Sequence, residues 1–147
     1  MRPLLDVTIL GSPKGQGSMR VIRGRALHPT ATLEHRTHVA LALAEEWAGR
    51  PPLDEALDVA LWFTFIRPRS HYRSGRHSHE LRPDAPEHMA VPIDIDKASR
   101  LCLDGGTYAG LWRDDALVTR LRATKQWASY DAAPSTRVML WRAGQGW

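Results

Sequence analysis

The 147-residue chain predicts an α+β fold, in which a small mixed β-sheet carries two main helices. Residues 57–66 place large apolar side chains at every second position, with the period of two that is typical of a strand. Residues 32–48 show helical spacing, and residues 97–103 form a second, shorter helical segment between acidic clusters. A chain of this size buries roughly 70% of its unfolded surface, so we expect one domain over residues 1–147.

Charge and cysteine content narrow the classes of function. Lys and Arg number 20 against 16 Asp and Glu, giving a net charge of +4 that favours anionic partners. The single cysteine, Cys102, excludes an internal disulfide. The sequence contains no apolar run long enough to predict a membrane span. We therefore expect an intracellular protein with no membrane partner and with an affinity for polyanions.

The N-terminal residues predict a strand followed by a basic loop. Residues 4–10 are apolar and in part β-branched, and the strand should stop at the Gly-Ser-Pro sequence that follows. The next stretch combines glycines with Lys and Arg, which predicts a flexible loop containing a short hairpin around residues 19–27. Lys14 and Arg20 are candidate contacts to a phosphate backbone. A solvated basic turn is the alternative.

A helix and a central strand come next. Ala40, Leu43, Ala44 and Trp47 repeat at i, i+3, i+4 and i+7, which predicts a helix packed on the sheet and ended at Gly49. In residues 57–66, one face of the predicted strand is apolar, so we place this strand at the centre of the sheet. The side chains on that face are Val59, Leu61, Phe63 and Phe65.

Residues 67–90 predict a long basic loop, because they are rich in Arg, His, Ser and Pro without an apolar period. Such a loop suits a nucleic-acid backbone. A zinc site on its histidines is disfavoured, since the loop lacks cysteine and the spacing is irregular. A disordered surface segment is the other alternative. The candidate phosphate contacts are Arg67, Arg69, Arg73 and Arg76.

Two pairs of aspartates organise the C-terminal half. Asp94 and Asp96 alternate with isoleucine, so an extended chain would point both carboxylates to one side. Asp96 can then cap the helix at 97–103, which we expect to end at the glycines 105–106. The second pair precedes two more predicted strands, at 117–127 with a basic outer face and at 136–142.

These acids predict a divalent-metal site that faces a phosphate. Mg²⁺ takes hard oxygen ligands and is held by one or two carboxylates together with waters and substrate oxygens. Asp94, Asp96 and Asp115 are the candidate ligands, with Asp114 beside them. Arg100, one turn after Asp96, can contact the phosphate. Purely structural roles are the alternative, with Asp96 as an N-cap and Asp114 as a turn residue.

Residues 94–125 resemble the RusA family of Holliday-junction resolvases. The resemblance lies in the Asp-Ile-Asp sequence at 94–96, the cation at Arg100, the sequence Gly-Leu-Trp-Arg-Asp-Asp-Ala at 110–116, and Lys125. The Pro-Lys-Gly sequence at 13–15, followed by Arg20, a helix and a central strand, fits the same layout.

The resemblance implies a RusA-like homodimer that cuts four-way DNA junctions with Mg²⁺ or Mn²⁺, in DNA recombination and repair. It implies a cytoplasmic location in a bacterial cell, with a phage gene as an alternative source. It carries the metal-binding role onto Asp94, Asp96 and Asp115, with Asp114 in support, and the essential basic role onto Arg100. Lys97 and Lys125 are further candidate contacts to DNA.

The chain departs from the family pattern in four places. Lys97 stands where the family usually has Asn, Arg100 where it has Lys, and Pro-Ile at 92–93 where it has Lys-Pro; the 67–90 loop is also long. Arginine binds phosphate well but cannot give up a proton. A non-catalytic branched-DNA binding protein is therefore the alternative. A glycosyltransferase with an Asp-Xaa-Asp metal site is disfavoured, since no nucleotide-binding βαβ unit is evident.

Overall fold

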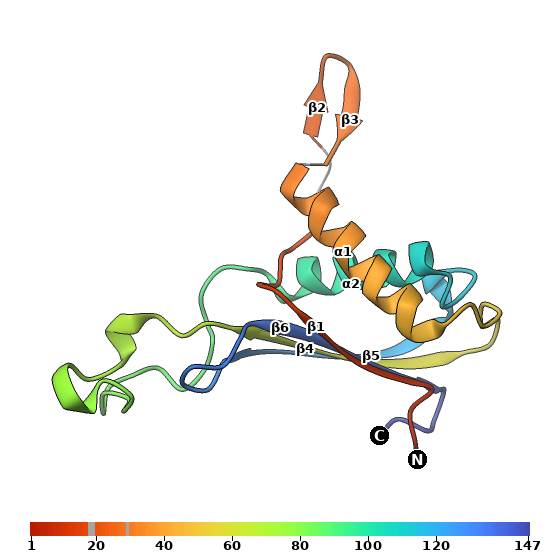
Figure 1. Ribbon diagram of the computed structural model, residues 1–147. Coiled ribbons are helices and arrows are strands. Elements are labelled where there is room, and N and C mark those ends of the chain that lie inside the picture. The colour runs from red at the N-terminus through yellow and green to blue at the C-terminus, as the bar shows by residue number, and fades with distance from the viewer. Residues whose placement is uncertain (18–19, 29) are drawn as a thin grey trace.

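The α+β fold predicted from the sequence is confirmed by a computed structural model that describes residues 1–17, 20–28 and 30–147 (Figure 1). The strands are β1 (Leu5–Leu10), β2 (Arg20–Ile22), β3 (Arg25–Leu27), β4 (Leu57–Phe65), β5 (Val118–Trp127) and β6 (Ser135–Arg142). The helices are α1 (Thr30–Trp47) and α2 (Ile95–Ala109), with short 3-10 turns η1 (Arg69–His71), η2 (Gly75–His77) and η3 (Asp115–Leu117).

Four strands form a mixed sheet in the order β1-β6-β4-β5. β4 pairs with β5 in parallel and with β6 antiparallel, while β1 lies antiparallel to β6 at one edge. The predicted central position of β4 is therefore confirmed. Its alternate residues, from Leu57 to Phe65, belong to the main hydrophobic core.

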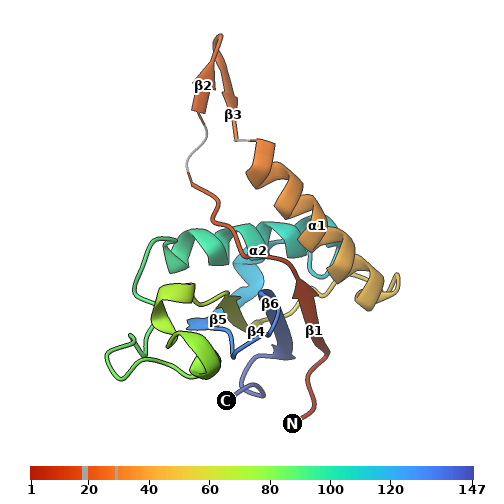
Figure 2. The same ribbon diagram turned by 60° about the vertical axis from the view of Figure 1, so that its left-hand side comes forward.

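Both helices cover the same face of the sheet (Figures 1 and 2). Leu43 of α1 and Leu101 of α2 are fully buried in the core against this face. The opposite face is basic and aromatic: the guanidinium of Arg137 lies 5.5 Å from the ring centroid of Trp62. The basic outer face predicted for β5 is present, because Arg120 and Arg122 lie on this side, over the ring of Trp147.

The hairpin of β2 and β3 projects from the body of the molecule in both views (Figure 2). It corresponds to the hairpin predicted around residues 19–27, of which Met19 lies outside the described residues. Val21 is 75% exposed. A two-stranded hairpin is only marginally stable by itself in water.

The second helix differs from its prediction at both ends. It starts at Ile95 with Asp94 at the N-cap, rather than after Asp96, and it continues through residues 105–106 to Ala109. The two glycines do not end the helix because they serve packing. A Cβ on Gly105 would lie 3.1 Å from Val39 of α1, and one on Gly106 would overlap the ring of Trp112. The helix ends instead at Gly110, which has a left-handed φ of 75°.

Residues 67–90 fold into a structured extension at the end of the sheet, beside the loop that joins β5 to β6 (Figure 1). Arg73 forms an ion pair of 2.6 Å with Glu80, and Arg67 donates a hydrogen bond of 2.6 Å to the carbonyl oxygen of Pro86. Tyr72 and Leu81 form an antiparallel bridge. Residues 67–90 are therefore ordered by these contacts, unlike the disordered surface segment that we considered as an alternative.

Among the described residues, no helix has the length and apolar character needed to span a membrane.

Candidate functional site

A cleft of about 800 Å³ lies between residues 88–96 and residues 123–125 of β5. Asp94 and Asp96 line it from the N-terminal end of α2, and Lys125 lines it from β5. The cleft thus brings the first predicted acidic pair to a concave surface. Asp96 lies on the first turn of the helix rather than on the extended segment that we predicted for both aspartates, whereas Asp94, at the N-cap, keeps an extended backbone.

A lysine neighbours the first of these aspartates. The ammonium nitrogen of Lys97 lies 2.9 Å from a carboxylate oxygen of Asp94, and both side chains are about half exposed. This hydrogen bond and the charge of Lys97 lower the pKa of the Asp94 carboxyl, while the same hydrogen bond raises the pKa of Lys97. Asp94 therefore stays ionised and already has a cation at its side.

Lys125 holds the chain that leads into the acidic pair. Its ammonium nitrogen donates hydrogen bonds to the carbonyl oxygens of Val91, at 2.9 Å, and of Ile93, at 2.8 Å. Lysine has three donors, so two are engaged in this position. These hydrogen bonds brace the segment that precedes Asp94, and the contact of Lys125 to DNA stays a prediction.

The second acidic pair lies at the far end of α2, around η3. A carboxylate oxygen of Asp114 accepts a hydrogen bond of 2.8 Å from the amide of Ala116, so Asp114 has the local turn role that we considered for it. Partial burial raises the pKa of Asp115, and the hydrogen bond and charge of Asp114 and the charge of Asp104 raise it further. Negative charge is therefore crowded at this position.

Asp104 is a member of this group that our sequence reasoning left aside as a helix-end acid. The buried side chain of Gln16 donates a hydrogen bond to Asp104 and accepts one of 3.2 Å from Arg36. A signal was present in the sequence. Asp96, Arg100 and Asp104 are spaced four residues apart, which places them along one face of a helix.

The acids form two groups along α2. We call Asp94 and Asp96 the N-terminal acidic group, and Asp104, Asp114 and Asp115 the C-terminal acidic group. Within residues 1–17, 20–28 and 30–147, no three His, Cys, Asp or Glu side chains lie close enough together to hold a metal ion. The donor chemistry nevertheless fits Mg²⁺, which prefers carboxylate oxygens, and a cation would relieve the charge that raises the pKa of Asp115.

The predicted basic residues divide into engaged and exposed side chains. Arg67 and Arg73 stabilise the extension at 67–90, as described above. Arg20 opens β2, but its side chain lies outside the described part of the structure. Lys97 is half exposed while it pairs with Asp94. The other side chains that remain exposed for contacts to a phosphate are Lys14, Arg69, Arg76 and Arg100.

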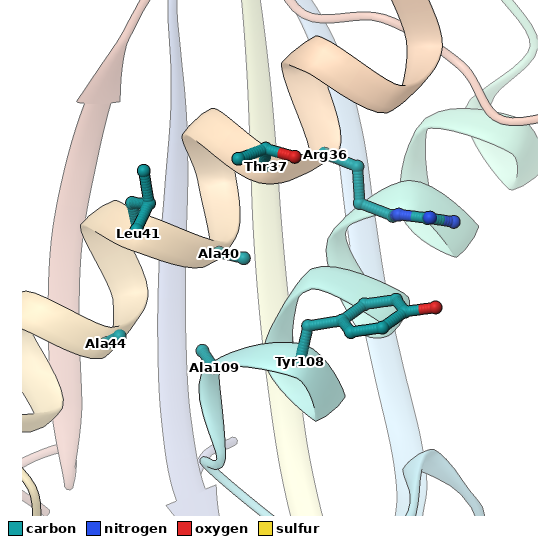
Figure 3. Close-up of a pocket in the computed structure, with 7 residues that line it drawn as sticks. All are labelled: Arg36, Thr37, Ala40, Leu41, Ala44, Tyr108 and Ala109. Carbon is teal, nitrogen blue, oxygen red and sulfur yellow. The ribbon is translucent and has the colours of Figure 1, made fainter.

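A separate pocket of about 300 Å³ lies between α1 and α2 (Figure 3). The guanidinium of Arg36 lies 4.7 Å from the centroid of the Tyr108 ring across this pocket. Its other lining residues are alanines, a threonine and a leucine, with no carboxylate. This pocket therefore lacks the acids needed for metal or acid–base chemistry, and the cleft beside Asp94 is the better candidate site.

Comparison with known proteins identifies the family of the chain. The family model described as Endodeoxyribonuclease RusA matches residues 11–140. No curated protein matches the chain. The matched range includes both acidic groups, Arg100 and Lys125, and it covers most of the 147 residues. The resemblance seen in the sequence is confirmed, and the chain belongs to the RusA family of endodeoxyribonucleases.

Proposed function

We propose that this protein is a Mg²⁺-dependent, structure-specific endonuclease that cuts four-way DNA junctions or related branched DNA. One observation carries the proposal: in a chain of an endodeoxyribonuclease family, Asp94 and Asp96 line an open cleft at the N-terminal end of α2. The cleft has a volume of about 800 Å³ and is open to solvent, so the two carboxylates are accessible from outside the protein.

The residues of both acidic groups have distinct proposed roles. Asp94 and Asp96 would hold Mg²⁺ or Mn²⁺ in the cleft, since Mg²⁺ needs only one or two carboxylates together with waters and substrate oxygens. Asp115, with Asp114 in support, lies at the other end of α2 and would hold an ion there rather than complete the first site. An ion bound in the cleft would supply positive charge to the scissile phosphate and lower the pKa of a water. Arg100, exposed on α2, would bind a phosphate oxygen through its planar guanidinium, without serving as a proton donor.

The start of α2 supports phosphate binding at the same place. The N-terminal end of a helix carries partial positive charge and free amide donors, which favour anions. The side chain of Asp94, at the N-cap, makes no capping hydrogen bond to these amides. The amides of the first turn thus have no side-chain acceptor at the N-cap, and a DNA phosphate in the cleft could accept hydrogen bonds from them.

Selection of the substrate would depend on shape and charge. Lys14, Arg69, Arg76 and Lys97 are exposed and would contact backbone phosphates, together with Arg20 of the projecting hairpin. Such binding weakens steeply as salt rises and does not read bases. A homodimer would place two clefts on one junction, which suits paired incisions on opposite strands.

The substitution Asp96→Asn tests the catalytic part of this proposal. The variant should bind a labelled four-way junction like the unmodified protein, because the change removes one negative charge without removing a contact to phosphate. It should lose Mg²⁺-dependent cleavage. Gel-shift and cleavage assays on the same preparation measure both properties, and full cleavage by the variant would overturn the assignment of Asp96.

A second candidate is a branched-DNA binding protein that has kept the fold and lost the chemistry. The ion pair of 2.9 Å between Lys97 and Asp94 favours it, because a cation of the protein itself occupies a candidate metal ligand. The two functions differ in one assay. A nuclease cuts the junction in Mg²⁺ and leaves it intact in EDTA, whereas a binding protein leaves it intact in both.

A further inference from the structure

Two adjoining cavities lie at the end of β5, beyond the cleft. The larger, of about 520 Å³, is bounded by residues 66–69, Tyr72, Ser78 and the β5–β6 loop at 128–133. The smaller, of about 360 Å³, shares Tyr72 and Tyr130 with it. We call the two together the tyrosine pocket. The proposed cleavage site in the cleft does not include this pocket.

The walls of the tyrosine pocket are aromatic. The rings of Tyr72 and Tyr130 meet edge to face, with centroids 5.6 Å apart and an angle of 69°. Tyr130 is 53% exposed, so much of its ring is open to a ligand. Trp127, which lines the smaller cavity, has a buried indole N–H without a protein acceptor in the described part of the chain. Exposed aromatic faces of this kind stack on nucleobases in proteins that bind single strands.

The charges at the pocket suit a nucleotide better than a simple anion. Arg67 is held in place by Pro86 and by the ring of Trp127, at 5.6 Å. Arg69 is exposed, and its side chain forms no hydrogen bond or ion pair with any described residue, so its guanidinium can bind a phosphate. Asp131 adds one carboxylate, which would repel a lone phosphate or an acidic peptide but can accept a hydrogen bond from an amino group on a base.

The position of the pocket connects it to the cleft. Lys125 lines the cleft and Trp127 lines the pocket, and two residues along a strand span about 7 Å. Residues 67–90 and the β5–β6 loop lie at the same end of the sheet (Figure 1). A DNA strand whose phosphate enters the cleft would therefore have a neighbouring nucleotide within reach of the tyrosine pocket.

We propose that the tyrosine pocket binds one unpaired nucleotide of the DNA substrate, with its base against Tyr130 and Tyr72 and its phosphate at Arg69. The inference rests on the proposed function for its DNA substrate and adds a subsite to it. Bases inside a duplex are stacked on each other and cannot offer a face to the protein. The pocket therefore favours branched DNA that carries an unpaired nucleotide beside the branch.

The substitution Tyr130→Ala tests the pocket, with Tyr130→Phe as the matched control. Tyr130 is preferred to Tyr72 because Tyr72 also forms the bridge to Leu81 that shapes the extension. Both variants are made in the full chain, and their melting temperatures are compared with that of the unmodified protein. Binding is measured in EDTA to three probes: a fully paired four-way junction, the same junction with an unpaired nucleotide beside the crossover, and a short single strand.

Stacking on an aromatic side chain contributes about 1–3 kcal/mol per base, so Tyr130→Ala should weaken binding of the single strand by roughly 5- to 150-fold. The same loss should occur for the junction with the unpaired nucleotide, and a smaller one for the fully paired junction. Tyr130→Phe keeps the ring and should bind all three probes like the unmodified protein. In addition, a photoreactive 5-iodouracil at the unpaired position should crosslink to Tyr130 or Tyr72.

Two of the possible outcomes separate the subsite from the nuclease proposal. If the unmodified protein binds the junctions but Tyr130→Ala binds every probe equally well, the subsite is overturned and the nuclease proposal stands. If the unmodified protein ignores four-way junctions but binds the single strand through Tyr130, the subsite stands and the junction specificity falls. Binding to none of the probes would overturn both.

Discussion

At the N-terminal end of α2, Lys97 lies 2.9 Å from Asp94, and Lys125 fastens the preceding backbone through two hydrogen bonds. At the other end, partial burial raises the pKa of Asp115, and the neighbouring Asp114 and Asp104 raise it further. The N-terminal acidic group is thus partly neutralised and braced by lysines, whereas the C-terminal acidic group crowds like charges. A divalent cation would displace a lysine from the first group and would relieve repulsion in the second.

Among the substitutions that test the difference between the two acidic groups, those in the C-terminal acidic group should have the largest effect on cleavage. We expect Asp115→Asn to slow junction cleavage on the order of 100-fold or more, since it removes a proposed metal ligand. Asp104→Asn should slow it by roughly 10- to 100-fold, as is typical of a residue that supports a ligand. Single-turnover cleavage rates measure both, with Asp84→Asn as a control at an exposed acid outside either group. Unchanged cleavage by Asp104→Asn would remove it from the site.

The next prediction distinguishes a brace from a contact to DNA. Lys125→Met should lower the single-turnover cleavage rate by roughly 10- to 100-fold, because the segment before Asp94 loses both of its hydrogen bonds to the ammonium. The salt dependence of junction binding should not change. By contrast, Arg76→Gln should reduce the salt slope by about 1 and leave the rate of the saturated complex intact. A reduced salt slope with normal cleavage in Lys125→Met would show that Lys125 acts only as a DNA contact.

A smaller effect is expected at Lys97. Exposed ion pairs are weak, so releasing Asp94 through Lys97→Asn should tighten Mg²⁺ binding only slightly, by up to about fivefold. The substitution also introduces the residue that is usual in the family. Isothermal titration with Mg²⁺ measures the change, and Lys14→Asn controls for the general loss of one positive charge. Weaker Mg²⁺ binding in Lys97→Asn would mean that Lys97 supports the metal site.

The smallest effects are opposite shifts in stability with pH, measured as melting temperatures in EDTA. The pKa of Asp115 is raised, so its ionisation destabilises the fold at neutral pH; Asp115→Asn should raise the melting temperature there. The pKa of Asp94 is lowered, so its ionised form stabilises the fold; Asp94→Asn should lower the melting temperature at neutral pH. Both differences should fade as acid protonates these carboxyls, and shifts of the same sign would contradict the comparison.

The sequence predicted those parts of the fold that depend on local periodicity. Alternation along residues 57–66 identified the central strand, and the spacing of Leu43 and Trp47 identified the buried side of α1. The helix end was wrong because Gly105 and Gly106 are needed where Val39 and Trp112 approach α2, and a single sequence does not show such long-range packing.

The candidate site was predictable in composition but not in arrangement. The acids, Arg100 and the family resemblance were all visible in the residue pattern. The contacts of Lys125 with Val91 and Ile93 cross more than thirty residues of chain, and nothing in their spacing signals them. Asp104 was overlooked because we placed it at a helix end, although its spacing from Asp96 and Arg100 would have placed it on their face of the helix.

The most direct test of the central claim is a single cleavage assay with the unmodified protein. A labelled four-way junction and a linear duplex are each incubated with the protein in Mg²⁺ and in EDTA. The proposed function predicts paired incisions in the junction with Mg²⁺, an intact junction in EDTA, and an intact linear duplex in both. A junction that is bound but uncut in Mg²⁺, or cut equally in EDTA, would contradict it.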